Sequence, residues 1–144
     1  WSYEAEHNTT VAAEPGEAPT LIPLETTDSK WRRYHITPVP GARAVALWMP
    51  KGGVGSRARI AGHEVQTGPT RGSSTHRRIM FFAPPEEGFD IELELDGDEP
   101  QDAWLVDVRG TLPESAQLLM KLRGALAVPV HTGDSAATYR RVRI

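Results

Sequence analysis

The stretch Arg78–Leu95 reads RIMFFAPPEEGFDIELEL, and it decides the fold class. In Phe89–Leu95 every second residue is apolar, and the residues between them are acidic. A period of two predicts a β-strand with one buried face and one solvent-exposed face. The segment Ile79–Phe82 is apolar on both sides, which is typical of a central strand. Because two prolines and a glycine separate the two segments, the stretch predicts an antiparallel hairpin in an all-β protein.

Similar patterns, separated by turn residues at fairly regular spacing, continue on both sides of this stretch. They predict strands at Thr20–Glu25, Trp31–Val39, Ala42–Met49, Ala103–Val108 and Thr138–Ile144, and a tight hairpin over Arg57–Val65 that turns at Ala61 and Gly62. The one candidate helix is Pro113–Arg123, which begins with proline and glutamate and ends before a glycine. About seven to nine short antiparallel strands with at most one short helix predict a β-sandwich, of jelly-roll or immunoglobulin-like type.

The length of 144 residues suits one domain. We therefore expect a single β-sandwich domain over residues 20–144, preceded by a linker or an edge strand in residues 1–19. The net charge of −3 is too small to indicate a nucleic-acid or an acidic-ligand partner. The absence of cysteine excludes disulfides and thiolate metal sites, and no apolar run approaches the roughly 20 residues of a membrane-spanning helix. Since the chain starts at Trp1 without a signal-peptide pattern, we expect an excised piece of a longer protein or a mature form.

Two patterns resemble ligand sites, and each also has a simpler structural explanation. Lys51–Gly55 looks like the start of a phosphate-binding loop, but such a loop continues with a lysine, a hydroxyl residue and a helix. Here the following residues alternate as a strand does, so we predict a flexible loop and no nucleotide. The five histidines lack the spacings that place two imidazoles on one metal ion, although His35 and His76 both fall on strands and could meet in space. We therefore predict no metal, cofactor or catalytic residue in this chain.

Charged side chains on the strands carry two further alternatives. Asp107 interrupts an apolar strand, and a buried carboxylate is either catalytic or bonded to turn amides or to Arg109; we favour the structural role. An acidic face (Asp90, Glu92 and Glu94) and a basic face (Arg140, Arg141 and Arg143) indicate either a ligand-binding surface, or cross-strand charge pairing or plain solvation. For these two faces we favour charge pairing or solvation over a ligand-binding surface.

Four tryptophans could form a platform on which sugar rings stack. Ala42–Met49 is apolar on both faces, so we expect it to be buried on both sides or nearly so. Trp48 and Trp104 lie within apolar strands and are predicted to belong to the core, which leaves Trp1 and Trp31 as candidates for a surface platform.

Five short segments together resemble a known arrangement: Ala18–Leu21, Arg57–Val65, Pro85–Leu95, Asp107–Pro113 and Thr138–Ile144. Their order is similar to the C-terminal extracytoplasmic domain of multi-pass membrane zinc peptidases of the M28 aminopeptidase family. The resemblance implies that the catalytic zinc domain and the membrane helices lie upstream of this chain. It also implies a β-sandwich that lies in the periplasm or a lumen, tethered to a membrane, and that performs no chemistry itself. The zinc ligands of the family cannot be placed on any position here, so zinc is expected only in the upstream peptidase domain.

This resemblance predicts a noncatalytic accessory domain of a zinc-dependent aminopeptidase, acting in docking, substrate access or stabilisation. The expected partner is the parent peptidase domain or the membrane surface, with no nucleic acid or nucleotide. Residues 118–130 are rich in leucine and valine, which indicates either closure of one end of the sandwich or a docking patch at Leu119 and Leu122. The alternative function is a free-standing carbohydrate- or peptide-binding module of sandwich type.

Overall fold

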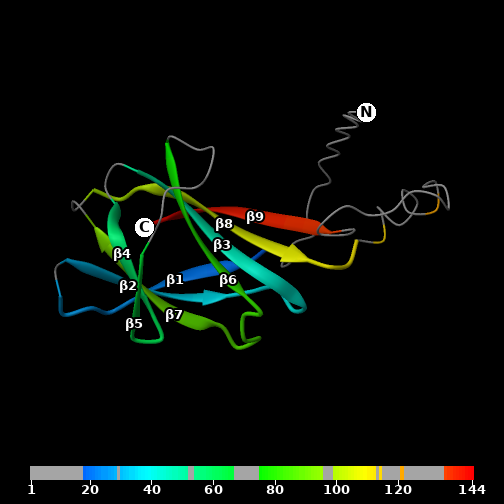
Figure 1. The fold of residues 1–144 in the computed structure, drawn as a ribbon, viewed down its shortest axis with the longest axis horizontal. Helices are drawn as coiled ribbons and strands as arrows, with labels where there is room; N and C mark the ends of the chain where they lie inside the picture. The colour runs from blue at the N-terminus through cyan, green and yellow to red at the C-terminus, as the bar shows by residue number, and fades with distance from the viewer. Residues whose placement is uncertain are drawn as a thin grey trace.

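The computed structural model describes residues 18–28, 30–51, 54–66, 75–95, 99–112, 114, 121 and 135–144. Within these residues the chain is almost entirely β-structure (Figure 1). The strands are β1 (Thr20–Leu24), β2 (Trp31–Thr37), β3 (Ala42–Pro50), β4 (Val54–Ile60), β5 (His63–Gln66), β6 (His76–Phe82), β7 (Phe89–Leu95), β8 (Asp102–Arg109) and β9 (Ala136–Arg143).

The strands form two antiparallel sheets. Sheet A has five strands in the order β1-β2-β7-β4-β5, and sheet B has four in the order β6-β3-β8-β9. One core cluster draws on both sheets, with Tyr34, Ile36, Ala58, Ile91 and Leu93 from sheet A and Val45, Leu47, Met49, Ala103 and Leu105 from sheet B, together with Ile144. Because the inner faces of two sheets enclose one core, the fold is a β-sandwich, and the prediction of fold class is confirmed.

The alternation in β7 places its side chains as predicted. Ile91 is 1% exposed and Leu93 is 0% exposed, and both lie on the inner face of sheet A. Strand β2 follows the same rule, since Tyr34 and Ile36 belong to the core while Arg33 and His35 face outward with the acids of β7.

The predicted hairpin between β6 and β7 is wrong. Strand β7 pairs with β2 and β4 in sheet A, whereas β6 pairs with β3 at the edge of sheet B. The connection between them crosses from one sheet to the other, with positive φ at Ala83 (49°) and Gly88 (91°). The two strands meet through their side chains instead, because the rings of Phe81 and Phe89 stack with centroids 4.3 Å apart. Strand β6 is therefore an edge strand, not the central strand that its apolar sequence indicated.

Other local predictions are confirmed. The β4–β5 hairpin turns at Ala61 and Gly62, whose φ angles of 49° and 80° are both positive, as a two-residue type I′ turn requires. Strand β3 lies at the centre of sheet B, where Val45 and Leu47 face the core and Ala46 on the opposite face is also buried. The first strand, β1, lies at the edge of sheet A, where its proline removes no essential ladder hydrogen bond.

Several predictions fall on residues that the structure does not describe. They are the helix over Pro113–Arg123 (apart from Glu114 and Lys121), the docking patch at Leu119 and Leu122, Trp1, and most of residues 1–19. Among the residues that are described, none belongs to a helix of the length and hydropathy that crossing a membrane requires.

Candidate functional site

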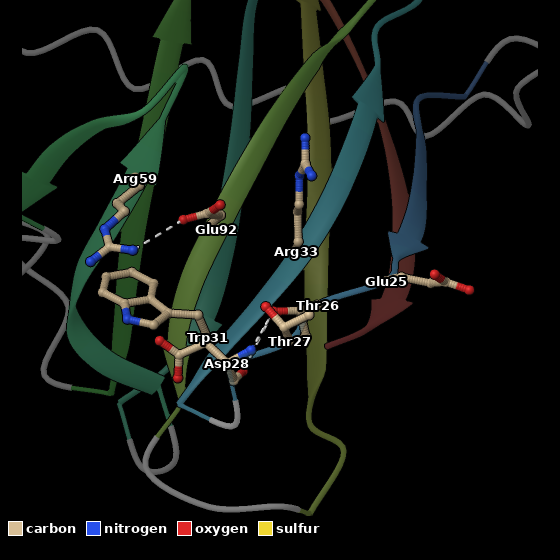
Figure 2. A pocket seen from close by; sticks show the side chains of 8 residues that line it. All are labelled: Glu25, Thr26, Thr27, Asp28, Trp31, Arg33, Arg59 and Glu92. Atoms are coloured by element: carbon tan, nitrogen blue, oxygen red, sulfur yellow. Dashed lines mark hydrogen bonds and ion pairs between the residues drawn. The ribbon is translucent and has the colours of Figure 1, made fainter.

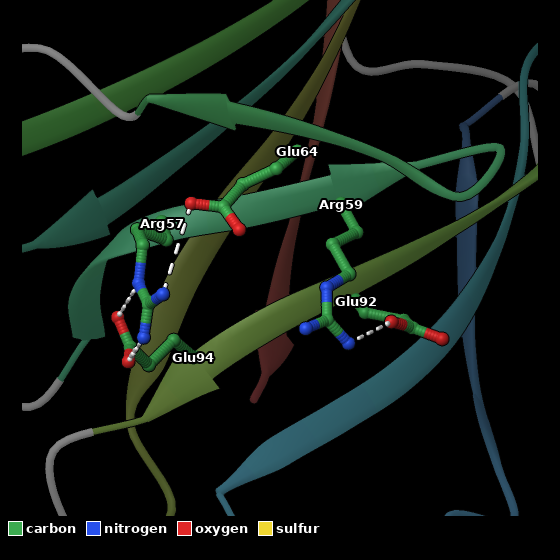
Figure 3. A network of polar contacts seen from close by, with 5 residues as sticks. All are labelled: Arg57, Arg59, Glu64, Glu92 and Glu94. Atoms are coloured by element: carbon green, nitrogen blue, oxygen red, sulfur yellow. Dashed lines mark hydrogen bonds and ion pairs between the residues drawn. The ribbon is translucent and has the colours of Figure 1, made fainter.

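The outer face of sheet A is a ladder of paired charges. Each acid of β7 meets a cation on a neighbouring strand, with contacts of 2.6 Å for Asp90–Arg33, 2.7 Å for Asp90–His35, 3.4 Å for Glu92–Arg59 and 2.5 Å for Glu94–Arg57. Figure 3 shows the Arg57, Arg59, Glu64, Glu92 and Glu94 part of this network. The charge pairing predicted for the acidic face is therefore confirmed, but the partners come from β2 and β4, not from the arginines of β9. A face whose charges are mutually compensated offers little unsatisfied charge to a ligand.

Trp31 lies at one end of this ladder and is covered. It is 5% exposed, and the guanidinium carbon of Arg59 lies 4.0 Å from a ring centroid of the indole. Figure 2 shows the open pocket of about 370 Å³ beside it, lined by Glu25, Thr26, Thr27, Asp28, Trp31, Arg33, Arg59 and Glu92. Because Arg59 occupies the face of the ring, Trp31 does not form the sugar-stacking platform that the sequence left open for it.

The imidazole of His35, on β2, makes polar contacts with β7 and with the connection between β6 and β7. Its Nδ1 lies 2.7 Å from Oδ1 of Asp90, and its Nε2 lies 3.1 Å from the carbonyl oxygen of Glu87. Both partners are acceptors, so the protonated imidazolium satisfies both contacts, and the hydrogen bond to Asp90 raises the pKa of His35. The other strand histidine, His76, lies in sheet B and contacts Thr75, so the two histidines hold different partners in different sheets.

Asp107 lies inside the sandwich and is 0% exposed. Its Oδ2 accepts a hydrogen bond of 2.6 Å from the backbone N–H of Val39, in the turn between β2 and β3. Burial raises the pKa of this carboxyl to about 6, against the lowering effects of the Val39 hydrogen bond and the charge of Arg109. This bond to a turn amide is one of the two structural contacts predicted for Asp107 from the sequence.

The outer face of sheet B carries apolar side chains on all four strands, together with the charged residues Arg78, Asp102, Arg141 and Arg143. Residues that share this face by register are Trp48, Met80, Phe82, Trp104, Val106, Val108 and Tyr139, which we call the aromatic face. Three of them are strongly exposed: Phe82 at 71%, Tyr139 at 58% and Trp104 at 42%. Trp104 and Tyr139 form an edge-to-face pair with centroids 5.6 Å apart.

The aromatic face corrects the assignment of the tryptophans. Trp48 and Trp104 were predicted to be core residues, but they lie opposite each other on the outer face of sheet B, half-buried and exposed respectively. The sequence did contain a sign of this surface, because some strands are apolar on both faces. A two-layer sandwich covers only one face of each strand, so the second apolar face has no layer of sheet to cover it.

Arginines lie beside the aromatic face. Arg78 lies over the ring of Trp48, with its guanidinium carbon 5.3 Å from the centroid. Arg141 forms a short hydrogen bond with Asp102, and the Nε of Arg143 lies 3.8 Å from the same carboxylate. The third arginine of the predicted basic face, Arg140, is opposite Leu105 in register and does not share this face. The basic face is thus divided, and Arg141 and Arg143 pair with Asp102 within sheet B.

Two other features considered from the sequence were a phosphate-binding loop and a metal site. Strand β4 begins at Val54, within the Lys51–Gly55 motif, where a phosphate-binding loop would lead into a helix. Among the described residues, no three His, Asp or Glu side chains gather in a group that could hold a metal ion. Comparison with models of protein families, with curated proteins and with solved structures finds no match to this chain.

Proposed function

We propose that this chain is a noncatalytic accessory domain that docks through the aromatic face of sheet B. Its partner is the peptidase domain of a membrane-bound M28-type zinc aminopeptidase, which lies upstream in the same polypeptide. In this proposal the domain is extracytoplasmic and zinc belongs to the upstream domain. The similarity of five sequence segments to the C-terminal domain of that family supports this choice of partner.

The contrast between the two outer faces carries the proposal. On sheet A, the outward-facing acids of β7 are paired with neighbouring cations. On sheet B, Phe82, Trp104 and Tyr139 keep between 42% and 71% of their surface exposed. Monomeric proteins rarely leave several large aromatic side chains of one sheet face exposed without a partner, and aromatic residues concentrate where proteins bind one another. The molecule therefore has one face suited to water and one suited to a partner.

The test measures binding of the purified chain to the separately expressed upstream peptidase domain. The double variant Trp104→Ser/Tyr139→Ser removes the exposed aromatic pair of the aromatic face. The matched control is Ile22→Ser, because Ile22 is also exposed (53%) but lies on the edge strand of sheet A. We expect the double variant to stay folded and to lose binding, while the control retains both. Unchanged binding by a folded double variant would refute docking through this face.

A second candidate, a carbohydrate-binding module, is favoured by one specific observation. The exposed Trp104–Tyr139 pair lies beside the Asp102–Arg141 ion pair, so apolar rings adjoin groups that can hydrogen-bond sugar hydroxyls. A glycan array decides between the two functions. Binding of a defined glycan that Trp104→Ser abolishes, without any affinity for the peptidase domain, would favour the module over the accessory domain.

A further inference from the structure

The two sheets differ sharply in charge. The strands of sheet B carry seven arginines and two aspartates, which leaves a formal surplus of five positive charges. The strands of sheet A carry four arginines and four acids, which balance. The whole chain has a net charge of −3, so the surplus on sheet B runs against the overall balance. This asymmetry concentrates positive charge on the sheet that also bears the aromatic face.

Part of that surplus adjoins the aromatic face. Arg141 and Arg143 share the single carboxylate of Asp102, which leaves this cluster of three groups positive. At the same end of the face, Arg78 lies over Trp48, which is opposite Trp104 in register. Guanidinium groups held beside apolar side chains are well suited to carboxylates, because they are weakly hydrated and donate hydrogen bonds in a planar fork.

We infer that the surface that covers the aromatic face is an acidic protein surface, with an apolar centre and carboxylates placed opposite Arg78 and Arg141. This inference rests on the proposed docking function and adds the chemistry of the partner surface. The apolar centre supplies most of the affinity through burial, and the carboxylates fix orientation and speed association. The peptidase domain should therefore carry aspartate or glutamate side chains around the patch that this chain covers.

The relief of the face favours a protein over a lipid surface. Along β3, Ala44 and Ala46 are 5% and 2% exposed, and they lie between longer side chains of β6 and β8. Short side chains between long ones on a hydrogen-bonded sheet form a rigid and uneven surface. Close packing against such a surface requires side chains of fixed position, which a protein partner supplies and a fluid layer of lipid headgroups does not.

The experiment measures binding to the upstream peptidase domain by calorimetry at 50 mM and 300 mM NaCl. Arg78→Gln/Arg141→Gln removes two positive charges beside the aromatic face. The matched control, Lys30→Gln/Arg140→Gln, removes two charges at exposed positions away from that face. We expect the first variant to bind at least about tenfold more weakly at low salt and the control to stay within about threefold of wild type. Added salt should weaken the binding of the wild-type chain more than the binding of the first variant.

The outcomes separate this inference from the docking proposal. If Trp104→Ser/Tyr139→Ser abolishes binding but the arginine variant and salt have no effect, docking stands and the acidic surface is refuted. If the peptidase domain does not bind but vesicles of phosphatidylserine and phosphatidylcholine bind through the same two arginines, the occupant is a lipid surface and both proposals fail. Absence of binding to either probe refutes both as well.

Discussion

Replacing Asp107 by asparagine is expected to make the protein more stable at neutral pH relative to wild type than it is at acidic pH. Burial raises the pKa of the Asp107 carboxyl from 3.8 to about 6, so the folded chain binds this proton more tightly than the unfolded chain. Wild type therefore loses stability as the pH rises from about 4 through about 6. Asparagine is uncharged at every pH and its side-chain oxygen still accepts the hydrogen bond of the Val39 amide, so the variant lacks this loss.

The magnitude follows from the two pKa values. One pKa unit corresponds to about 1.4 kcal/mol, and between pH 4.5 and pH 7.5 the difference between folded and unfolded proton binding amounts to about 2 kcal/mol. The relevant quantity is the free energy of unfolding of Asp107→Asn minus that of wild type, which should rise by this amount over that interval. Contributions of other titrating groups cancel in the difference, because both proteins contain them.

The assay is urea unfolding of both proteins at pH 4.5 and pH 7.5. The matched control is Asp102→Asn on the same strand, where the hydrogen bond from Arg141 lowers the pKa of the exposed carboxyl. Because this carboxyl titrates at or below 3.8 in both the folded and the unfolded chain, the control should stay nearly constant relative to wild type between pH 4.5 and pH 7.5. A difference for Asp107→Asn that stays constant, or that falls as the pH rises, would contradict the raised pKa of the buried Asp107 carboxyl.

Three further predictions concern sheet A and its crossing loop. Ile91→Asp should lower the free energy of unfolding by about 3 kcal/mol or more, because it buries an unpaired charge. For Glu92→Gln, this free energy should stay within about 1 kcal/mol of the wild-type value. Equal urea midpoints for the two variants would contradict the assignment of Ile91 to the inner face of β7 and Glu92 to the outer face. Gly88→Ala should lower the melting temperature by several degrees, because φ is 91° and the new Cβ would lie 2.4 Å from the carbonyl oxygen of Ile36; an unchanged melting curve would show that the loop relaxes freely. His35→Gln should destabilise the protein more at pH 5.5 than at pH 8.5. The raised pKa of His35 gives stability that is present below about pH 6.5 and is lost as the pH rises through the pKa of the folded state. A loss of stability that does not depend on pH would show that the protonated imidazole does not stabilise the fold.

The candidate site shows where reasoning from local pattern succeeds and where it stops. The acids of β7 were recognised as one outward face because alternation is a property of the strand alone. Their partners, Arg33 on β2 and Arg59 on β4, could not be chosen from the sequence, because pairing depends on which strands lie side by side. The sequence did not predict that the aromatic face is exposed, for a related reason. The pattern of apolar residues along a strand is the same whether or not a second layer covers them.

Several features could be predicted from short stretches of the sequence: the strands of period two, the turn at Ala61 and Gly62, the inward position of Ile91, and the all-β class. These depend on backbone sterics and on the polarity of near neighbours, which every short segment carries within it. Other features required the three-dimensional structure: β6 and β7 belong to different sheets, Trp31 is covered by Arg59, and Trp104 faces outward. Those outcomes depend on contacts between segments far apart in the chain, and strand sequences of similar hydrophobicity are compatible with more than one such arrangement.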